Sequence, residues 1–435
     1  MRITLGNLLA SIFRPAGARR WLAVAVLMLV HAGDLHDAGA APQSGWDRDE
    51  PEIDPPTCER VHEERVEGDS EGGAGPIVEL YACGTEISAS EARAFLDRRA
   101  ALYEELASFL DTTAAALPSL EYHLYQRLED LALRTNRMEP VVVDFEARRV
   151  HIARERGIDG ENLNRDALLL LRSVLGRPST RILETGLWMQ FVERWHGEAP
   201  LYWTSWIARG NAAWPVSELL EQRGSPGTNP QGWGRNRRAD GDREYLNRSP
   251  LIRRALAAGL VDLLLREAGR EPFLEGYASW TPTEGEHEQL AAWWSPYLDS
   301  LATARAEELS KRSERTVELS SLEGFNFAHE GHNIVDGYAS ARADSALTEL
   351  AEMGVNAVSI LPYAHLRGLH EPAPISVHHS ADDENDASLR HVIHQARARE
   401  MSVMLKPHLW TGEGWIGDLE MRSDADWDRF FTYYE

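Results

Sequence analysis

From Gly324 to Glu435 the chain alternates short apolar runs with longer segments of helical periodicity. The segments DSALTELAEMG and DASLRHVIHQARAREM have apolar residues at the spacing of an amphipathic helix. Strands that alternate with helices in this way are typical of parallel α/β folds. The sequence therefore predicts three βα units with ligand-type side chains where the strands end, and the strands are GFNFAH, VNAVSILPY and SVMLKPHLW.

These motifs resemble the opening of glycoside hydrolase family 113, a TIM-barrel family known for β-mannanase activity. The stretches that carry the resemblance are, in order, GFNFAHEGHNIVDGYAS, VNAVSILPY, SVMLKPHLWTGEGWIGDLEM and DADWDRFFTYYE. The resemblance implies that residues 322–435 are the first three βα units of an incomplete (β/α)8 TIM barrel. It also implies a carbohydrate partner, namely a β-linked polysaccharide or oligosaccharide of the mannan type.

Polar and aromatic residues around the ends of these strands have the chemistry of a sugar cleft. Amide and imidazole groups bond sugar hydroxyls, and flat rings stack on the apolar faces of sugars. For Trp410, packing beneath the barrel rim is the alternative to stacking on a sugar. The predicted substrate-binding residues are Asn326, His329, Tyr338, Lys406, His408, Trp410 and Trp415.

Glycosidic cleavage normally uses two carboxyl groups. The resemblance implies that both are glutamates at the ends of the fourth and seventh barrel strands, which would follow Glu435. Glu413 lies on a Gly-flanked loop, where a carboxylate is difficult to hold in catalytic geometry. We therefore expect no catalytic residue in this chain, although the parent activity would be retaining hydrolysis of a β-linked polysaccharide. The alternative is a non-catalytic exported protein that binds a glycan or a protein.

Residues 76–312 predict an α+β domain that precedes the barrel segment. IVELYACGTEI and LEYHLYQ predict strands, SASEARAFLDRRAALYEELASFL a helix behind a Ser cap, and PVVVDFEARRVHIAR a hairpin-like pair. This order, followed by two helices, resembles gluzincin-type metallopeptidases. In those proteins a helical His-Glu-x-x-His and a later Trp-x-x-Glu-Gly type motif bind one zinc ion.

The matching stretches here, LETGL and WIARG, have lost the zinc ligands. Leu183 and Leu187 occupy the two His positions, Arg209 occupies the Glu position, and Glu184 keeps the place of the general base. A Leu side chain has no electron pair for zinc and an Arg repels it. We expect an inactive, degenerate gluzincin-like domain without metal or cofactor. An unrelated α+β domain in which both leucines are core residues is the alternative.

A binding role is compatible with either interpretation of this domain. Its candidate contacts are exposed tryptophans among Trp203, Trp206 and Trp214.

The first 41 residues resemble an export signal. Arg19 and Arg20 precede the apolar run Trp21 to Val30, and Ala38-Gly39-Ala40 supplies the small residues of a cleavage site. This run is shorter than the roughly 20 residues that span a bilayer. We expect a periplasmic or extracellular protein without a membrane span after signal cleavage, an uncleaved anchor being the alternative. Residues 42–75, rich in Pro, Asp, Glu and Gly, predict an acidic flexible linker.

Cys58 and Cys83 are the only cysteines. In an oxidising compartment they are expected to form a disulfide worth roughly 3 kcal/mol, the alternative being two unrelated thiols. The 69 acidic and 45 basic residues give a net charge of −24, which argues against a nucleic-acid partner. The sequence gives no indication of the oligomeric state.

Overall fold

The computed structural model divides into two compact units, one formed by Met1–Asp54 with Glu307–Glu323 and the other by Pro55–Ala306 with Gly324–Glu435. In the first, β1 (Ile3–Thr4) pairs antiparallel with β7 (Thr316–Val317). The second unit has an N-terminal part, residues 55–306, and a C-terminal part, residues 324–435. The structure describes residues 3–4, 54–66, 75–155, 163–178, 180–210, 212–220, 250–280, 282–310, 316–317, 323–328, 334–366, 368–372, 386–411 and 414–434.

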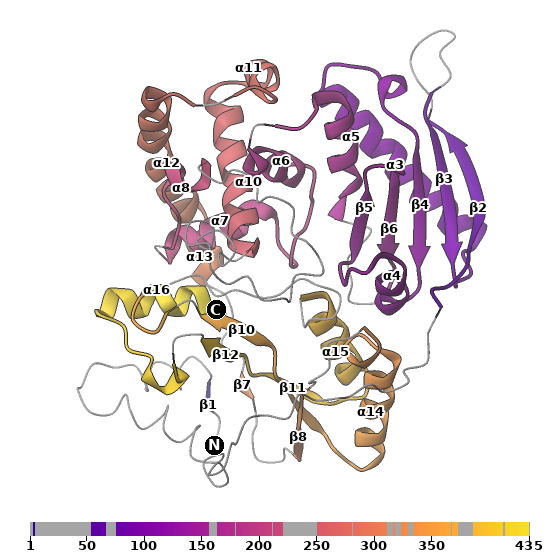
Figure 1. Ribbon diagram of the computed structural model, residues 1–435, viewed down its shortest axis with the longest axis vertical. Coiled ribbons are helices and arrows are strands. Elements are labelled where there is room, and N and C mark those ends of the chain that lie inside the picture. Colours follow the sequence, from indigo (N-terminus) through magenta and orange to yellow (C-terminus); the bar gives the residue numbers. More distant parts are fainter. Residues whose placement is uncertain are drawn as a thin grey trace. The chain divides into compact units, whose positions relative to one another are not determined.

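A five-stranded mixed sheet organises the N-terminal part, with strand order β2-β3-β4-β6-β5 (Figure 1). The three central strands are parallel, and an antiparallel strand lies at each edge. Buried Val, Leu and Ile side chains of the parallel strands alternate with polar ones. The strands are β2 (Cys58–Arg65), β3 (Ile77–Cys83), β4 (Leu120–Tyr125), β5 (Val141–Asp144) and β6 (Arg149–Ala153).

Within the range 42–75, which the sequence predicts to be a flexible linker, strand β2 corrects the prediction for Cys58–Arg65. Its sequence, CERVHEER, has no apolar face, so periodicity gave no sign of it. It is instead held by backbone pairing to β3, from Cys58 opposite Cys83 to Arg65 opposite Ile77. The expected disulfide is present and joins the first of these pairs. Its charged side chains suit an exposed sheet edge, where they discourage pairing with another chain.

A buried polar contact fixes two helices on this sheet. The predicted helix is α3 (Ala89–Phe109), and its Ser88 forms the expected cap together with Glu91. Arg99 of α3 lies 3.0 Å from Asp166, which begins α5 (Asp166–Leu175). Tyr122 of β4 donates to the same carboxylate at 2.7 Å. Because all three side chains are buried, each depends on the others for polar partners.

A group of helices completes the N-terminal part. Helix α6 ends at Met189, and a turn follows in which His196 and Gly197 adopt left-handed backbone angles (φ 51° and 84°). The helices are α6 (Arg181–Met189), α7 (Pro200–Arg209), α8 (Val216–Leu220), α10 (Pro250–Glu267), α11 (Arg270–Gly276) and α12 (Glu284–Ala304). Helix α13 (Ala306–Ser310) falls almost entirely in the first unit.

The C-terminal part has the predicted alternation of strands and helices. Its sheet is parallel with order β11-β9-β8. Strands β10 and β12 extend the same pairing, since Ile360 lies opposite Leu405 and Tyr363 opposite His408. The elements are β8 (Gly324–Phe327), α14 (Ala341–Glu352), β9 (Ala357–Ile360), β10 (Tyr363–Leu366), α15 (Asp386–Ala398), β11 (Ser402–Leu405), β12 (His408–Thr411) and α16 (Asp424–Tyr434).

Helices α14 and α15 cover one face of this sheet. Val358 and Ile360 of β9 are buried against Leu347 and Val392 of these helices. The described strands do not close into a barrel, so the TIM barrel stays a prediction. The predicted signal segment lies outside the described residues apart from Ile3–Thr4. Within the described part of the chain, we find no helix whose length and apolar character would let it cross a membrane.

Gly186 sets the distance between α6 and α10. A Cβ atom at this position would lie 2.2 Å from the carbonyl oxygen of Ala257 on α10. We predict that Gly186→Ala destabilises the fold by about 1–3 kcal/mol, because α10 must shift to admit the methyl group. The matched control is Gly285→Ala on α12, where an added Cβ meets nothing within 4 Å.

The control should be neutral or stabilising by up to about 1 kcal/mol, as expected for Gly to Ala in a helix. The measurement is the free energy of unfolding in urea for each variant. Equal stability of the two variants would show that α6 and α10 are not closely packed at Gly186.

Candidate functional site

Three neighbouring rings form what we call the aromatic row, made of Tyr363, His408 and Trp410. The ring of His408 is stacked with that of Trp410, with centroids 5.7 Å apart and planes at 19°. Tyr363 lies 5.4 Å from His408 and 6.2 Å from Trp410. Two residues apart on β12, His408 and Trp410 point to the same face, and the parallel register places Tyr363 beside them.

The aromatic row faces away from the core of its own strand pair. On the other face, Ala364 and Leu366 of β10 are buried with Phe430 of α16. Trp410 remains 53% exposed. An exposed stacked pair of rings beside a third ring is a surface on which a flat ligand can lie.

Lys406 and His408 add polar groups to this surface. Burial and the nearby Lys406 charge lower the pKa of His408 below its ordinary value. A neutral imidazole offers one hydrogen-bond donor and one acceptor. At neutral pH, His408 can therefore bond a ligand hydroxyl in either direction.

The structure brings some of the predicted sugar-binding residues together and separates others. Trp415 is 62% exposed on the segment after β12, and Asn326 is exposed on β8. Tyr338 is 1% exposed, and its hydroxyl donates to the Phe327 carbonyl at 2.8 Å. The Tyr338 ring therefore packs in the interior and is not open to a ligand.

His329 and Glu413 lie outside the described residues. The site residue that the prediction lacked is Tyr363, for which the available signal was its place at the end of the second strand.

The degenerate zinc positions of α6 have core and ion-pair roles. Leu183 and Leu187 are 1% and 0% exposed. Both oxygens of Glu184 are engaged by Arg172, at 2.6 Å to Nε and 2.7 Å to Nη2. Arg209 is exposed at the end of α7. A carboxylate held in this way by a guanidinium is not free to act as a general base.

The three tryptophans expected as candidate contacts are packing residues. Trp214 is buried and Trp203 and Trp206 are half-buried. The indole of Trp203 donates to the Trp195 carbonyl at 2.8 Å. None of the three is exposed, so the expectation that exposed tryptophans among them serve as contacts is wrong.

A cavity of about 230 Å³ lies beside α6. Leu183, Trp280 and Trp293 contribute to its mainly apolar lining. Its acidic lining residue, Glu286, accepts hydrogen bonds from Thr283 and so caps α12. A cavity of this size and character suits a small apolar group, and it lacks the convergent polar groups that orient a substrate.

A buried histidine joins the two parts of this unit. His391 of α15 is fully buried, with Nε2 2.7 Å from Asp344 of α14 and Nδ1 2.6 Å from Glu155, which follows β6. The contact to Glu155 is a close ion pair rather than a well-aligned hydrogen bond. Arg127 also pairs with Asp344, at 2.9 Å. Burial opposes the charge on His391, but the two carboxylates outweigh it and raise its pKa to about 9.

Comparison of the chain with protein-family models, with curated proteins and with solved structures finds no match.

We predict that the stability of the protein falls as pH rises through about 9. The pKa of His391 is raised from an ordinary value near 6.5 in the folded state. Its contribution is therefore complete below about pH 6.5 and is lost as pH rises through about 9, by an amount on the order of 3 kcal/mol. Thermal unfolding of the wild type should shift downward across this window.

His391→Gln provides the comparison. The glutamine side chain cannot take a proton. The thermal unfolding midpoint of this variant should therefore be lower than that of the wild type at neutral pH, and it should change less between pH 7 and 9. The same fall of the midpoint in both proteins would assign the pH dependence to other groups.

Proposed function

We propose that this chain binds a β-linked glycan on the aromatic row. The observation that carries the proposal is the stacked and exposed pair His408 and Trp410 with Tyr363 beside it. Pyranose rings of β-linked chains present apolar C–H faces that lie on indole and phenol rings. The centroid separations of 5.4–6.2 Å give a platform wider than one side chain, which favours an oligosaccharide over a small ion.

Polar groups at the platform supply orientation. Lys406 donates to hydroxyl oxygens, and the neutral imidazole of His408 both donates and accepts. Trp415 is a further exposed ring, on the segment that follows β12. Apolar stacking with a few polar groups is the usual composition of a carbohydrate site.

The resemblance to glycoside hydrolase family 113 supports the same ligand class. The three βα units that carry it have parallel strands in the sequential order β8, β9, β11. We extend the proposal to a longer parent protein, which would be an exported retaining glycoside hydrolase acting on a mannan-like polysaccharide. In such an enzyme the aromatic row would be one wall of the cleft, and two carboxyl groups elsewhere would perform the cleavage.

A second candidate function is protein binding at the sheet β11-β9-β8. Phe325, Met404 and Leu405 are each at least 50% exposed on its outer strands. Among the described residues, β8 and β11 each pair on one side only. Exposed apolar side chains on an open sheet edge favour pairing with another strand.

We predict that Trp410→Ala weakens glycan binding about tenfold, corresponding to about 1.4 kcal/mol of lost stacking. Phe325→Ala is the matched control, because Phe325 is an aromatic of similar exposure (57%) outside the aromatic row. The measurement is calorimetric titration of each protein with manno-oligosaccharides and with cello-oligosaccharides.

Binding of wild type and Phe325→Ala with equal affinity, and a loss with Trp410→Ala, is the expected result. If no β-linked oligosaccharide binds, or if both variants lose the same affinity, the aromatic row is not a glycan site.

We predict that the chain releases no reducing ends from mannan. The assay is prolonged incubation of the purified chain with mannan, followed by measurement of reducing ends. Turnover that disappears in Glu413→Gln would instead make Glu413 a catalytic residue. Turnover that survives this substitution would reveal a catalytic pair elsewhere in the chain.

A further inference from the structure

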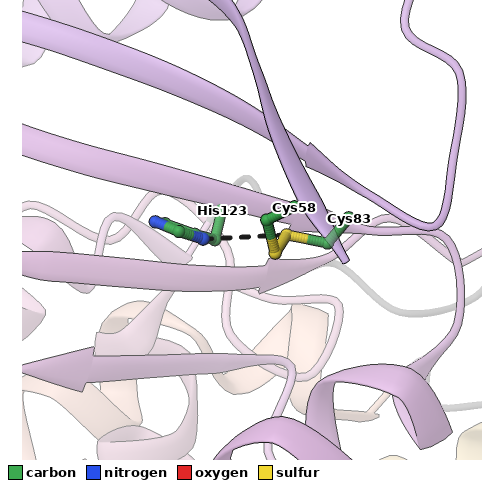
Figure 2. A group of neighbouring side chains, drawn as sticks. All are labelled: Cys58, Cys83 and His123. Atoms are coloured by element: carbon green, nitrogen blue, oxygen red, sulfur yellow. Dashed lines mark hydrogen bonds between the residues drawn. A yellow bond between two sulfur atoms is a disulfide. The ribbon is translucent and has the colours of Figure 1, made fainter. Parts of the chain in front are cut away.

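We propose that reduction of the Cys58–Cys83 disulfide opens a zinc site formed by the two thiolates and the imidazole of His123. In Figure 2 the His123 ring points one nitrogen at the disulfide. This nitrogen is Nδ1, and it lies 3.7 Å from Cys83 Sγ. The inference concerns a different part of the chain from the aromatic row and does not rest on glycan binding.

The ligand atoms are already close to the spacing that zinc requires. The two sulfurs and one ring nitrogen all lie within 4.8 Å of one another. Tetrahedral zinc has bonds of about 2.0–2.3 Å, which places its ligand atoms roughly 3.3–3.8 Å apart. The 3.7 Å separation between the nitrogen and the Cys83 sulfur fits this value. Zinc binding therefore requires the two bonded sulfurs to move apart and Cys58 Sγ to lie at a similar distance from the nitrogen.

The sheet keeps the two cysteines together when the bond between them is broken. Cys58 and Cys83 are directly opposite in the antiparallel pair β2 and β3, with Cα atoms 4.0 Å apart. Next to them, Gly84 donates to the Thr57 carbonyl at 3.1 Å. His123 is held on the neighbouring strand opposite Tyr81. Backbone pairing therefore positions all three ligands independently of the disulfide.

A set of polar and stacking contacts fixes the His123 ring in the orientation of a metal ligand. Its Nε2 lies 3.3 Å from Oε2 of Glu121, which in turn pairs with Arg149 at 2.8 Å. Because a carboxylate only accepts, Nε2 carries the hydrogen, and the lone pair of Nδ1 faces the sulfurs. Tyr81 stacks on the imidazole at 4.5 Å. A carboxylate behind the distal nitrogen is the usual support of a zinc-bound histidine.

The redox step is a thiol–disulfide exchange. A dithiol reductant supplies two electrons and two protons, becomes a disulfide itself, and leaves two cysteine thiols. Zinc binding then displaces the two thiol protons. The divalent cation, two thiolates and a neutral imidazole sum to zero charge, which suits a site containing the fully buried Cys83.

Three protein ligands leave the fourth zinc position for water. The Tyr125 hydroxyl lies at the margin of the site, 4.0 Å from Cys58 Sγ. Cys58 is half-buried, which gives the reductant and the cation a route in. The oxidised cysteines have no thiolate to offer, so the redox state decides whether the cation binds.

The experiment uses the full chain with Co²⁺ as the probe for this zinc site. The protein is reduced with dithiothreitol, freed of reductant without oxygen, and titrated with Co²⁺ alongside the oxidised protein. We expect one equivalent of Co²⁺ with a thiolate-to-cobalt charge-transfer band in the reduced protein, and displacement of the cobalt by one equivalent of Zn²⁺. The oxidised protein should show no such band, which also controls for weak binding by the chain's 16 histidines.

Variants test the roles of His123 as a zinc ligand and of Glu121 as the residue that supports its ring. His123→Ala should weaken Zn²⁺ binding at least tenfold in competition with a chelating dye, and Glu121→Gln by about 10- to 100-fold. His62→Ala, on strand β2 but outside the site, should bind as the wild type does.

Three results would overturn the proposal. They are a reduced, folded protein without a charge-transfer band, a His123→Ala variant that binds Zn²⁺ as tightly as the wild type, and a reduced protein that loses its sheet without recovery. Circular dichroism distinguishes the last case. Recovery of the sheet signal on addition of one equivalent of Zn²⁺ would support the proposal, because metal binding would then be coupled to folding.

Discussion

The protonated His391 is the contact on which the larger unit depends. It places one positive charge between Glu155 from the N-terminal part and Asp344 from the C-terminal part. Two carboxylates at this depth require such a partner, since an unpaired buried charge costs several kcal/mol. Glu129 adds a hydrogen bond from the Ala341 backbone at the start of α14. Residues 55–306 and 324–435 therefore share one compact unit, although the sequence suggests two separate domains.

Local periodicity predicts the elements well where one face is buried. The cap at Ser88 predicts helix α3, and apolar residues at helical spacing predict α14 and α15. Strand β2 is not predicted from the sequence, because it is held by backbone pairing and a disulfide. Neither interaction requires apolar residues at regular spacing. The contact of His391 with Glu155 could not be predicted from the sequence for a different reason. Its partner Glu155 is remote in sequence, and a histidine on a helix has many ordinary explanations.

The candidate site shows the same division between local and non-local information. Position at a strand end predicts His408 and Trp410, because parallel strands bring their ends together. It misplaces Tyr338, whose hydroxyl spans two strands by bonding the Phe327 carbonyl and the Leu361 amide. The presence of a tyrosine in the sequence does not distinguish binding to a ligand from packing in the interior, since both roles use a ring and a hydroxyl. Glu184 is similar: its spacing is that of a base, while the Arg172 fork that engages it appears only in three dimensions.

The cysteines connect the edge of the sheet to its redox chemistry. The intact disulfide links β2 covalently to β3. It stabilises the fold by roughly 3 kcal/mol, because it reduces the conformational entropy of the unfolded chain. Breaking this link leaves an edge strand of mostly charged residues held by backbone pairing alone. A zinc ion bridging Cys58, Cys83 and His123 would restore a link and extend it to β4, the second strand inward. Strand β2 would then be linked to the sheet in either redox state. Reduction would replace the disulfide link with a zinc link and would not release the strand.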